Sequence, residues 1–261
     1  MPSKIYDAPA KLNIFLKLTG RRDDGYHLIA SRFVRYGALS DKLWFERALA
    51  DGFDVTGDFN CPLENNTIYR AYTILSRLHP SKALFAFAGA HKVVVYKSVP
   101  SGAGLGGASS DSATFLMMIN EEADLKLSSE ELSIVGAQVG ADVPFFLSGY
   151  ESANVSGAGE KIAPFDEPLP RFEVKTPPIL CETTRVYQTF RRHFSDRMQS
   201  AAEAADRLLK ANAKDILREY DPEELNDLLE PALKCYPELR EYKEEGWFLS
   251  GSGGSFFRSA V

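Results

Sequence analysis

The chain has 261 residues, of which 44% are hydrophobic, so it suits one large domain or two of ordinary size. Its 30 Lys and Arg against 36 Asp and Glu give a net charge of -6, which favours neither nucleic acid nor an anionic membrane as a partner. The 3 cysteines are far apart and lack C-x-x-C spacing, so they suggest neither a disulfide framework nor a zinc site. The first residues lack an apolar signal core, and no run approaches the roughly eighteen apolar residues of a membrane span, so we expect a cytoplasmic protein.

Two segments before residue 100 have the patterns of β-strands. In residues 11–18, KLNIFLKL, apolar residues occupy every second position, which predicts a half-buried strand. The other face carries Lys11 and Asn13 and is available for a site. Residues 91–99, HKVVVYKSV, form a second strand-like run, which Pro100 ends.

The next segment, PSGAGLGGASS, has four glycines within six residues and leads into a helical pattern. It matches G-x-G-x-x-G, the dinucleotide fingerprint, with Glu122 about twenty residues further on. That interpretation requires the acidic residue at the end of a second strand, but residues 123–132, ADLKLSSEEL, read as the start of a second helix. A Walker A loop requires a lysine after the last glycine, and Ala108 stands there.

The remaining interpretation is a glycine loop that opens a helix. In such a loop, unpaired backbone N–H groups and the positive end of the helix dipole point at an anion such as a phosphate. Ser109, Ser110 and Asp111 are residues that can cap a helix whether or not a phosphate is present. A tight turn into a capped helix therefore stays an alternative.

Beyond this helix, Ser128 and Glu131 have capping-box spacing, which predicts a helix over residues 128–139. We expect Gly140 to supply its left-handed stop. Residues 141–147, ADVPFFL, read as the start of a new strand.

A change of composition divides the chain. Prolines are densest between residues 164 and 178, and we place a domain change near residue 152, which gives domains of 1–152 and 153–261. The second part holds helical runs and a closing segment rich in strand formers and glycine; they lie at residues 201–220, 222–234 and 246–261.

Three segments carry a resemblance to a known family. Taken alone, Lys11 is more often part of a solvated strand face, and the closing SGSGGSFF is more often a plain turn. In this order, however, APAKLNIFLKL, PSGAGLGGASSDSA and SGSGGSFF resemble the three motifs of the GHMP kinases, and GADVPFFLSG fits between the last two. The resemblance implies an α+β, two-domain GHMP kinase fold with the active site between the domains. Residues 1–152 would then be the ATP-binding domain, and 153–261 would contribute to the acceptor site.

The resemblance also implies an activity, phosphoryl transfer from ATP with Mg²⁺ to an alcohol. In the family a Lys and an Asp flank the reacting hydroxyl, and the matching residues here are Lys11 and Asp142. An aspartate is a weak base for an alcohol, but this matters less in phosphoryl transfer, where positioning and charge stabilisation dominate. Alternatively, Asp142 makes only a local Asx-turn.

By the same resemblance, the glycine loop wraps the phosphates of ATP, and two residues elsewhere contact adenine. Ser109 and Ser110 could each reach a phosphate or Mg²⁺. Asn66 and Lys97 fall where related kinases contact the base, although Asn66 can instead cap the following helix. The loop residues expected at ATP are Pro100, Ser101, Gly102, Ala103, Gly104, Leu105, Gly106, Gly107, Ala108, Ser109 and Ser110.

On the acceptor side, Tyr26, His27 and Tyr187 match positions where one branch of the family holds cytosine. The resemblance to that branch implies as acceptor a cytidyl diphosphate sugar-alcohol, phosphorylated on its 2-hydroxyl, and Asn13 would touch the sugar-alcohol. Tyr187 can equally belong to the core, and a lone histidine such as His27 is more often structural.

Two departures and two rival functions accompany this interpretation. Ser156 stands where the family commonly has a basic residue, which puts a diphosphate contact from that position in doubt, and the chain ends four residues after Phe257, where relatives usually continue. The rivals are a GHMP kinase with a mevalonate-like or homoserine-like acceptor and a nonenzymatic nucleotide sensor on the same fold. The presence of both Lys11 and Asp142 disfavours the sensor.

Overall fold

The computed structural model describes residues 4–48, 52–59 and 61–260. The chain forms two compact units, each assembled from separate segments. Unit 1 contains the chain up to Ala10, Gly37–Val99 and Gly106–Gly149; unit 2 contains Lys11–Tyr36, Pro100–Leu105 and the chain from Tyr150 onward. The contiguous domains 1–152 and 153–261 stay a prediction.

Two long strands contribute to both units, β1 (Tyr6–Arg21) and β2 (His27–Arg47). In unit 1 the second half of β2 pairs antiparallel with β4 (His91–Tyr96), so that Phe45 faces Val93 across the ladder. A short strand, β3 (Asp54–Gly57), runs parallel to β4 at the edge. The predicted strand over residues 91–99 is therefore confirmed over its first six residues.

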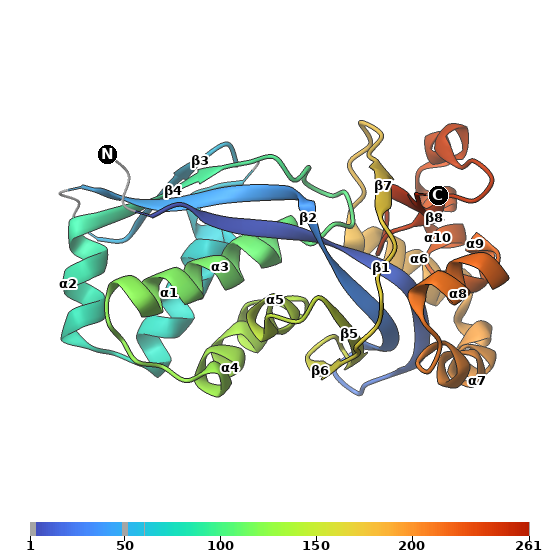
Figure 1. Ribbon diagram of the computed structural model, residues 1–261, viewed down its shortest axis with the longest axis horizontal. Helices are drawn as coiled ribbons and strands as arrows, with labels where there is room; N and C mark the ends of the chain where they lie inside the picture. The colour runs from blue at the N-terminus through green and yellow to red at the C-terminus, as the bar shows by residue number, and fades with distance from the viewer. Residues whose placement is uncertain (1–3, 49–51, 60, 261) are drawn as a thin grey trace. The chain divides into compact units, whose positions relative to one another are not determined.

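The helices of unit 1 cover one face of these strands (Figure 1). They are α1 (Thr67–Leu78), α2 (Lys82–Ala90), α3 (Gly107–Glu122), α4 (Ser129–Val139) and α5 (Val143–Ser148), with a short 3₁₀ turn at Leu63–Asn65. Helix α3 packs against α1, α4 and α5 and is buried along most of its length. From Ser110 onward, α3 thereby lies in the core of the unit, whereas Ala108 in its first turn is exposed.

Two predictions around residue 140 need correction. The predicted helix and its Ser128–Glu131 capping box are confirmed, but Gly140 is extended, with φ of -174°, rather than left-handed. The predicted strand over residues 141–147 is wrong, because α5 is a helix there. Pro144 in its first turn suits a helix start, since the fixed φ of proline is already helical. The left-handed stop comes later, at Gly149.

Unit 2 contains two groups of strands. The first half of β2 pairs antiparallel with β5 (Ser152–Gly157), which pairs in turn with β6 (Lys161–Pro164). A separate sheet has the order β7-β9-β8, with β7 at Phe172–Lys175, β8 at Phe248–Leu249 and β9 at Phe256–Ser259. The predicted strands of the closing segment are confirmed.

The helices of unit 2 include the runs predicted between residues 201 and 234. They are α6 (Thr183–His193), α7 (Met198–Leu208), α8 (Ala213–Glu219), α9 (Pro222–Leu225) and α10 (Leu229–Cys235), with 3₁₀ turns at Ser195–Arg197 and Pro237–Tyr242. Helix α10 packs against α6. Among the described helices, none combines the length and the apolar character needed to cross a membrane.

Strand β1 is more deeply buried than its alternating pattern predicts. Every residue from 8 to 18 is buried, so the prediction of a half-buried strand is wrong. Polar side chains can be buried when they find partners, and those of β1 do. Lys17 pairs with the carboxylate of Asp227 and donates to the carbonyl of Glu224 at 3.1 Å.

Candidate active site

The glycine-rich loop owes its glycines to backbone conformation and to close packing. Gly102, Gly104 and Gly106 have φ of +66°, +73° and +73°, a region that favours glycine. A Cβ on Gly104 would lie 2.1 Å from the carbonyl oxygen of Ser250. Glycine is therefore required at position 104 by contact with the closing segment, whatever the loop binds.

The loop, the closing segment and β1 meet within unit 2. The hydroxyl of Ser250 donates to the carbonyl of Gly104 at 3.1 Å. The ammonium of Lys11 donates to the same carbonyl at 3.1 Å and to the amide oxygen of Asn13. The three segments singled out in the sequence thus converge on one carbonyl oxygen.

The ammonium of Lys11 is buried, and its hydrogen bonds fix its position. Only 3% of Lys11 is exposed, and its Nζ lies 4.8 Å from the centre of the Phe33 ring. The alternative of a solvated strand face is therefore wrong for Lys11. The prediction that Asn13 shares its face is confirmed, and Asn13 is itself fixed by a bond from its Nδ2 to the hydroxyl of Ser31 at 3.1 Å.

The start of α3, in unit 1, differs from the predicted capped helix. The N-cap is Gly106, which has no side chain to cap with, and Ser109, Ser110 and Asp111 lie inside the first turns. The prediction that these three residues cap the helix is therefore wrong. Among the described residues, three side-chain oxygens are buried without a hydrogen-bond partner: Ser110 Oγ and Asp111 Oδ1 at this helix start, and Ser76 Oγ in α1. Buried polar atoms normally have partners, and only at this helix start do two of the three belong to adjacent residues.

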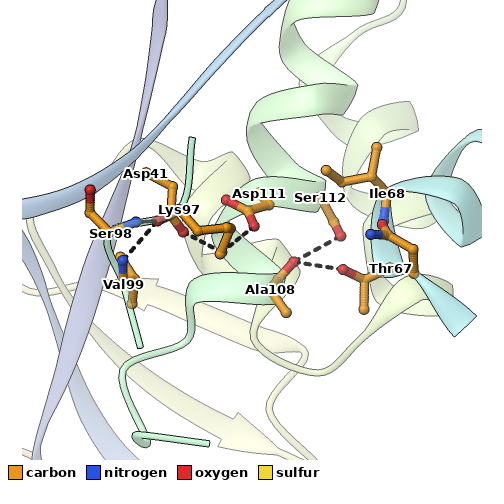
Figure 2. A network of polar contacts seen from close by, with 10 residues as sticks. Asp41, Thr67, Ile68, Lys97, Ser98, Val99, Ala108, Asp111 and Ser112 are labelled. Atoms are coloured by element: carbon orange, nitrogen blue, oxygen red, sulfur yellow. Dashed lines mark hydrogen bonds and ion pairs between the residues drawn. The ribbon is translucent and has the colours of Figure 1, made fainter. Parts of the chain in front are cut away.

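A buried ionic cluster lies beside this helix start (Figure 2). The ammonium of Lys97 bonds to the carboxylates of both Asp41 and Asp111, the latter at 2.6 Å. Asp41 also accepts the backbone N–H groups of Ser98 and Val99. This cluster thereby connects β2, the segment that follows β4 and the N-terminal part of α3.

The charges in this cluster are unequal, with two carboxylates on one ammonium. Burial lowers the pKa of Lys97, but Asp111 and Asp41 together raise it above its ordinary value, so the ammonium stays charged. Burial raises the pKa of Asp111 to about 7, against the attraction of Lys97, and the nearby Asp41 carboxylate adds to the rise. Asp111 therefore exchanges its proton near neutral pH.

Asn66 and Asp142 occupy positions before helices of unit 1. Asn66 is buried, and its Oδ1 caps α1 by accepting the N–H of Ile68 at 2.8 Å, so the capping alternative is confirmed. Its contact with adenine stays a prediction. Asp142 is half-buried before α5 and makes no capping bond to it. An Asx-turn would need an N–H at Pro144, which proline lacks, so that alternative is wrong.

Two of the predicted acceptor residues, His27 and Tyr187, lie together in an aromatic group within unit 2. The ring of His27 lies 5.4 Å from that of Tyr187 and 5.8 Å from that of Phe190. Tyr187 is half-buried, whereas 64% of Tyr26 is exposed. Burial lowers the pKa of His27, and the positive charges of Arg21 and Arg191 lower it further. The imidazole is therefore neutral at physiological pH, with one nitrogen to donate and one to accept.

Comparisons with known proteins bear directly on these groups. The family model described as "GHMP kinases N terminal domain" matches residues 66–150. A 4-diphosphocytidyl-2-C-methyl-D-erythritol kinase of Sulfurimonas denitrificans is 45% identical, covering 99% of this chain and 97% of that protein. The protein of that name from Helicobacter pylori is 36% identical, covering 97% and 93%.

The chain belongs to the GHMP kinase family.

A crystal structure of a 4-(cytidine 5'-diphospho)-2C-methyl-D-erythritol kinase agrees with this assignment. It is 29% identical, has a TM-score of 0.72, and the match covers 98% of this chain and 90% of that one. The mevalonate kinase of Methanococcus jannaschii shares the fold with a TM-score of 0.61 but only 11% identity. The predicted GHMP kinase fold is confirmed, and the chain is a phosphotransferase that uses ATP and an alcohol acceptor.

The sequence did not single out Asp41 in this kinase, although it carried a signal. Leu43 and Phe45 are buried at alternate positions of β2, and Asp41 continues that series two residues earlier. A charged residue at a core-facing strand position needs a partner, which here is Lys97. Asp111 was recognised only as a helix cap.

Proposed function

We propose that this kinase transfers the γ-phosphate of ATP to the 2-hydroxyl of 4-diphosphocytidyl-2-C-methyl-D-erythritol, a step of the non-mevalonate isoprenoid pathway. Relatives of that name match the chain over nearly its whole length. The observation that carries the proposal is the buried Lys11, held by Asn13 and by the carbonyl of Gly104 in the glycine loop.

Lys11 and Asp142 have distinct roles in the proposed reaction. The transition state of phosphoryl transfer is loose, so catalysis rests on positioning and charge stabilisation more than on a strong base. Lys11, fixed in direction by two bonds, offsets negative charge on the transferred group. Asp142 orients the acceptor hydroxyl and accepts its proton.

The nucleotide phosphates are assigned to the loop and the start of α3. Positive φ at Gly102 and Gly106 lets backbone N–H groups approach a phosphate without a side chain in the way. The buried, partnerless Ser110 Oγ fits a phosphate oxygen or Mg²⁺ as its missing partner. Mg²⁺ commonly takes one or two protein oxygens and completes its shell with phosphates and water, and when bound it neutralises phosphate charge.

The acceptor base is assigned to Tyr26, His27 and Tyr187. Tyrosine faces stack on a base, and the neutral His27 ring can both donate to and accept from the polar edge of cytosine. Asn13 contacts the sugar-alcohol. A cytoplasmic location goes with these assignments, because the reaction consumes ATP, and it stays a prediction.

The test replaces the two proposed catalytic residues and compares each with a matched control. Asp142→Asn and Lys11→Met should each lower kcat by about 10²-fold to 10⁴-fold, the range for a positioned acid-base group. The double variant should lose little more than either single one, since both act on one transferred group.

Lys17→Met is the control for Lys11, because Lys17 is also buried on β1 but pairs with Asp227. It should lower the free energy of unfolding while leaving kcat of the folded protein within about twofold. Near wild-type kcat in folded Asp142→Asn, or equal loss in Lys17→Met and Lys11→Met, would remove these residues from catalysis.

A further inference from the structure

The carboxylate of Asp41 is wholly buried, and its two oxygens accept hydrogen bonds from different donors. Oδ1 accepts the backbone N–H groups of Ser98 and Val99, the latter at 2.7 Å. Oδ2 accepts the ammonium of Lys97. Val99 is the last residue before Pro100, where the glycine loop begins, so Oδ1 fixes how the chain enters that loop.

We propose that Asp41 is a positioning residue for ATP: Oδ2 aims Lys97 at the nucleotide, and Oδ1 anchors the chain where it enters the glycine loop. The proposal rests on the proposed function, in which the glycine loop holds the phosphates of ATP, and on the contact of Lys97 with adenine that the family resemblance implies. Asp41 itself touches no reacting atom in this scheme and acts through its neighbours.

The geometry favours aiming over simple charge pairing. Lys97 has two carboxylate contacts that approach its ammonium from different elements, Asp111 on α3 at 2.6 Å and Asp41 on β2. With a single partner the flexible lysine side chain could rotate about that contact; with two, its Nζ has one position.

Close packing at the helix start supports the same role. A Cβ on Gly107, the first residue of α3, would lie 3.0 Å from the side chain of Val99 and 3.6 Å from Asp41 Oδ2. The carboxylate therefore sits directly against the backbone that begins α3. A displacement of Asp41 would move Lys97 and this backbone together.

Because the two oxygens of Asp41 have different partners, one substitution can remove the contact to Lys97 and keep the contacts to the backbone. In Asp41→Asn the carbonyl oxygen can still accept the N–H groups of Ser98 and Val99, but the NH₂ group then faces the ammonium, and two donors cannot bond. This variant should raise the Kd for ATP about tenfold and leave kcat within about twofold. Lys97→Met should give the same tenfold change.

Non-additivity distinguishes positioning from a structural role. The double variant Asp41→Asn/Lys97→Met should bind ATP no more weakly than Lys97→Met alone. Without the ammonium of Lys97, the side chain at position 41 no longer orients any group toward ATP. This double variant also lacks an ammonium facing an amide, so it carries the comparison if Asp41→Asn alone does not fold. Asp41→Ala removes both functions and should lower kcat as well.

Glu46→Gln is the matched control. Glu46 lies on the same strand as Asp41 and pairs at 3.3 Å with Lys92 of β4, the strand that leads to Lys97, but 41% of its side chain is exposed. The Glu46→Gln substitution removes one carboxylate charge, as Asp41→Asn does, and should leave the Kd for ATP unchanged.

ATP binding is measured directly by calorimetry, and thermal melting is recorded for each variant. A lower melting temperature with unchanged Kd in Asp41→Asn, or additive losses in the double variant, would overturn the proposal. Because the readout is ATP binding without acceptor, it is separate from the acceptor assignment. If the wild-type protein binds ATP but does not phosphorylate the cytidyl acceptor, the proposed function fails while the role of Asp41 is still decided.

Discussion

Two buried ionic clusters of this kinase differ in whether all of their polar atoms have hydrogen-bond partners. In unit 2, the guanidinium of Arg32 bonds to Glu167 at 2.8 Å, to Asn154 at 2.7 Å, and to two backbone carbonyls. In unit 1, the cluster of Asp41, Lys97 and Asp111 leaves Asp111 Oδ1 with no hydrogen-bond partner among the described residues. Both clusters are buried, so burial alone does not explain the difference.

The complete cluster is a structural connection. Both side chains of the Arg32–Glu167 pair are 0% exposed, and the guanidinium lies 3.4 Å from the centre of the Phe165 ring. The other oxygen of Glu167 accepts the N–H of Ala213, so no polar group of the pair is available to a ligand. The incomplete cluster, by contrast, lies beside Ser110 at the start of α3, where we place the phosphates of ATP. Under the proposed function, the nucleotide supplies the partners that this cluster lacks.

The largest predicted effect on stability comes from the complete cluster. Arg32→Met leaves Glu167 as a buried charge without its partner, so we expect a loss of about 3–5 kcal/mol in the free energy of unfolding. Urea unfolding measures this loss. The Kd for ATP of the folded variant should not change, and a large change would break the distinction between the two clusters.

Arg258→Met is the control for this prediction. Arg258 pairs with Glu173 at 2.6 Å, but 47% and 49% of their side chains are exposed. An exposed pair contributes about 0–1 kcal/mol, so this variant should remain within that range of the wild type.

The next effect concerns the pH dependence of the incomplete cluster. The pKa of Asp111 rises on folding, so between about pH 4 and pH 7 the unfolded chain releases this proton while the folded chain keeps it. The contribution of Asp111 to stability is therefore greatest at low pH and is lost as the pH rises toward 7.

Asp111→Asn removes this titration. The free energy of unfolding of the variant, relative to the wild type, should increase from pH 5 to pH 8 by at least about 1.4 kcal/mol, the equivalent of one pKa unit. Urea unfolding at several pH values tests this. A difference that is constant with pH would show that Asp111 titrates alike in both states.

A smaller effect is expected at the acceptor residues, which share unit 2 with the Arg32 cluster. His27→Ala should change the free energy of unfolding by less than about 1 kcal/mol. It should reduce the preference for a cytidyl over a uridyl acceptor severalfold, because the polar edge of the base loses its partner. Steady-state kinetics with both acceptors measures this preference. Unchanged preference would assign His27 to structure alone.

His27 also gives this region a pH dependence. Its pKa lies below the ordinary value, so the ring stays neutral down to a lower pH than a free histidine would. The KM for the acceptor should be constant from pH 8 to about 6.5 and rise at lower pH as the ring is protonated. In His27→Ala this rise should be absent.

The sequence predicted those parts of the fold that rest on local signals. The strand at residues 91–96 and the capping box at Ser128 were found because β-branched runs and capping spacing are local. The short apolar run before Gly149 was misread, because periodicity alone cannot separate a short strand from a short helix. The full burial of β1 was missed, because it depends on partners from distant segments such as Gly104 and Asp227.

The candidate site divides in the same way. Lys11, Asn13 and the loop were recognisable as motifs, and their mutual contacts in unit 2 agree with that recognition. Asp41 belongs to no motif, and its partner Lys97 is far from it in sequence. A contact of this kind is created by the pairing of β2 with β4, which a single sequence does not specify.

The acceptor assignment is tested most directly by kcat/KM of the wild-type protein for four acceptors in the presence of ATP and Mg²⁺. They are 4-diphosphocytidyl-2-C-methyl-D-erythritol, its uridyl analogue, mevalonate and homoserine. A site built from Tyr26, His27 and Tyr187 penalises acceptors without a cytosine, because its aromatic faces and polar groups are then left without partners. We predict that kcat/KM is highest for the cytidyl acceptor, lower for the uridyl analogue, and lower by at least about 10³-fold for mevalonate and homoserine. Equal efficiency with mevalonate or homoserine would contradict the proposed function.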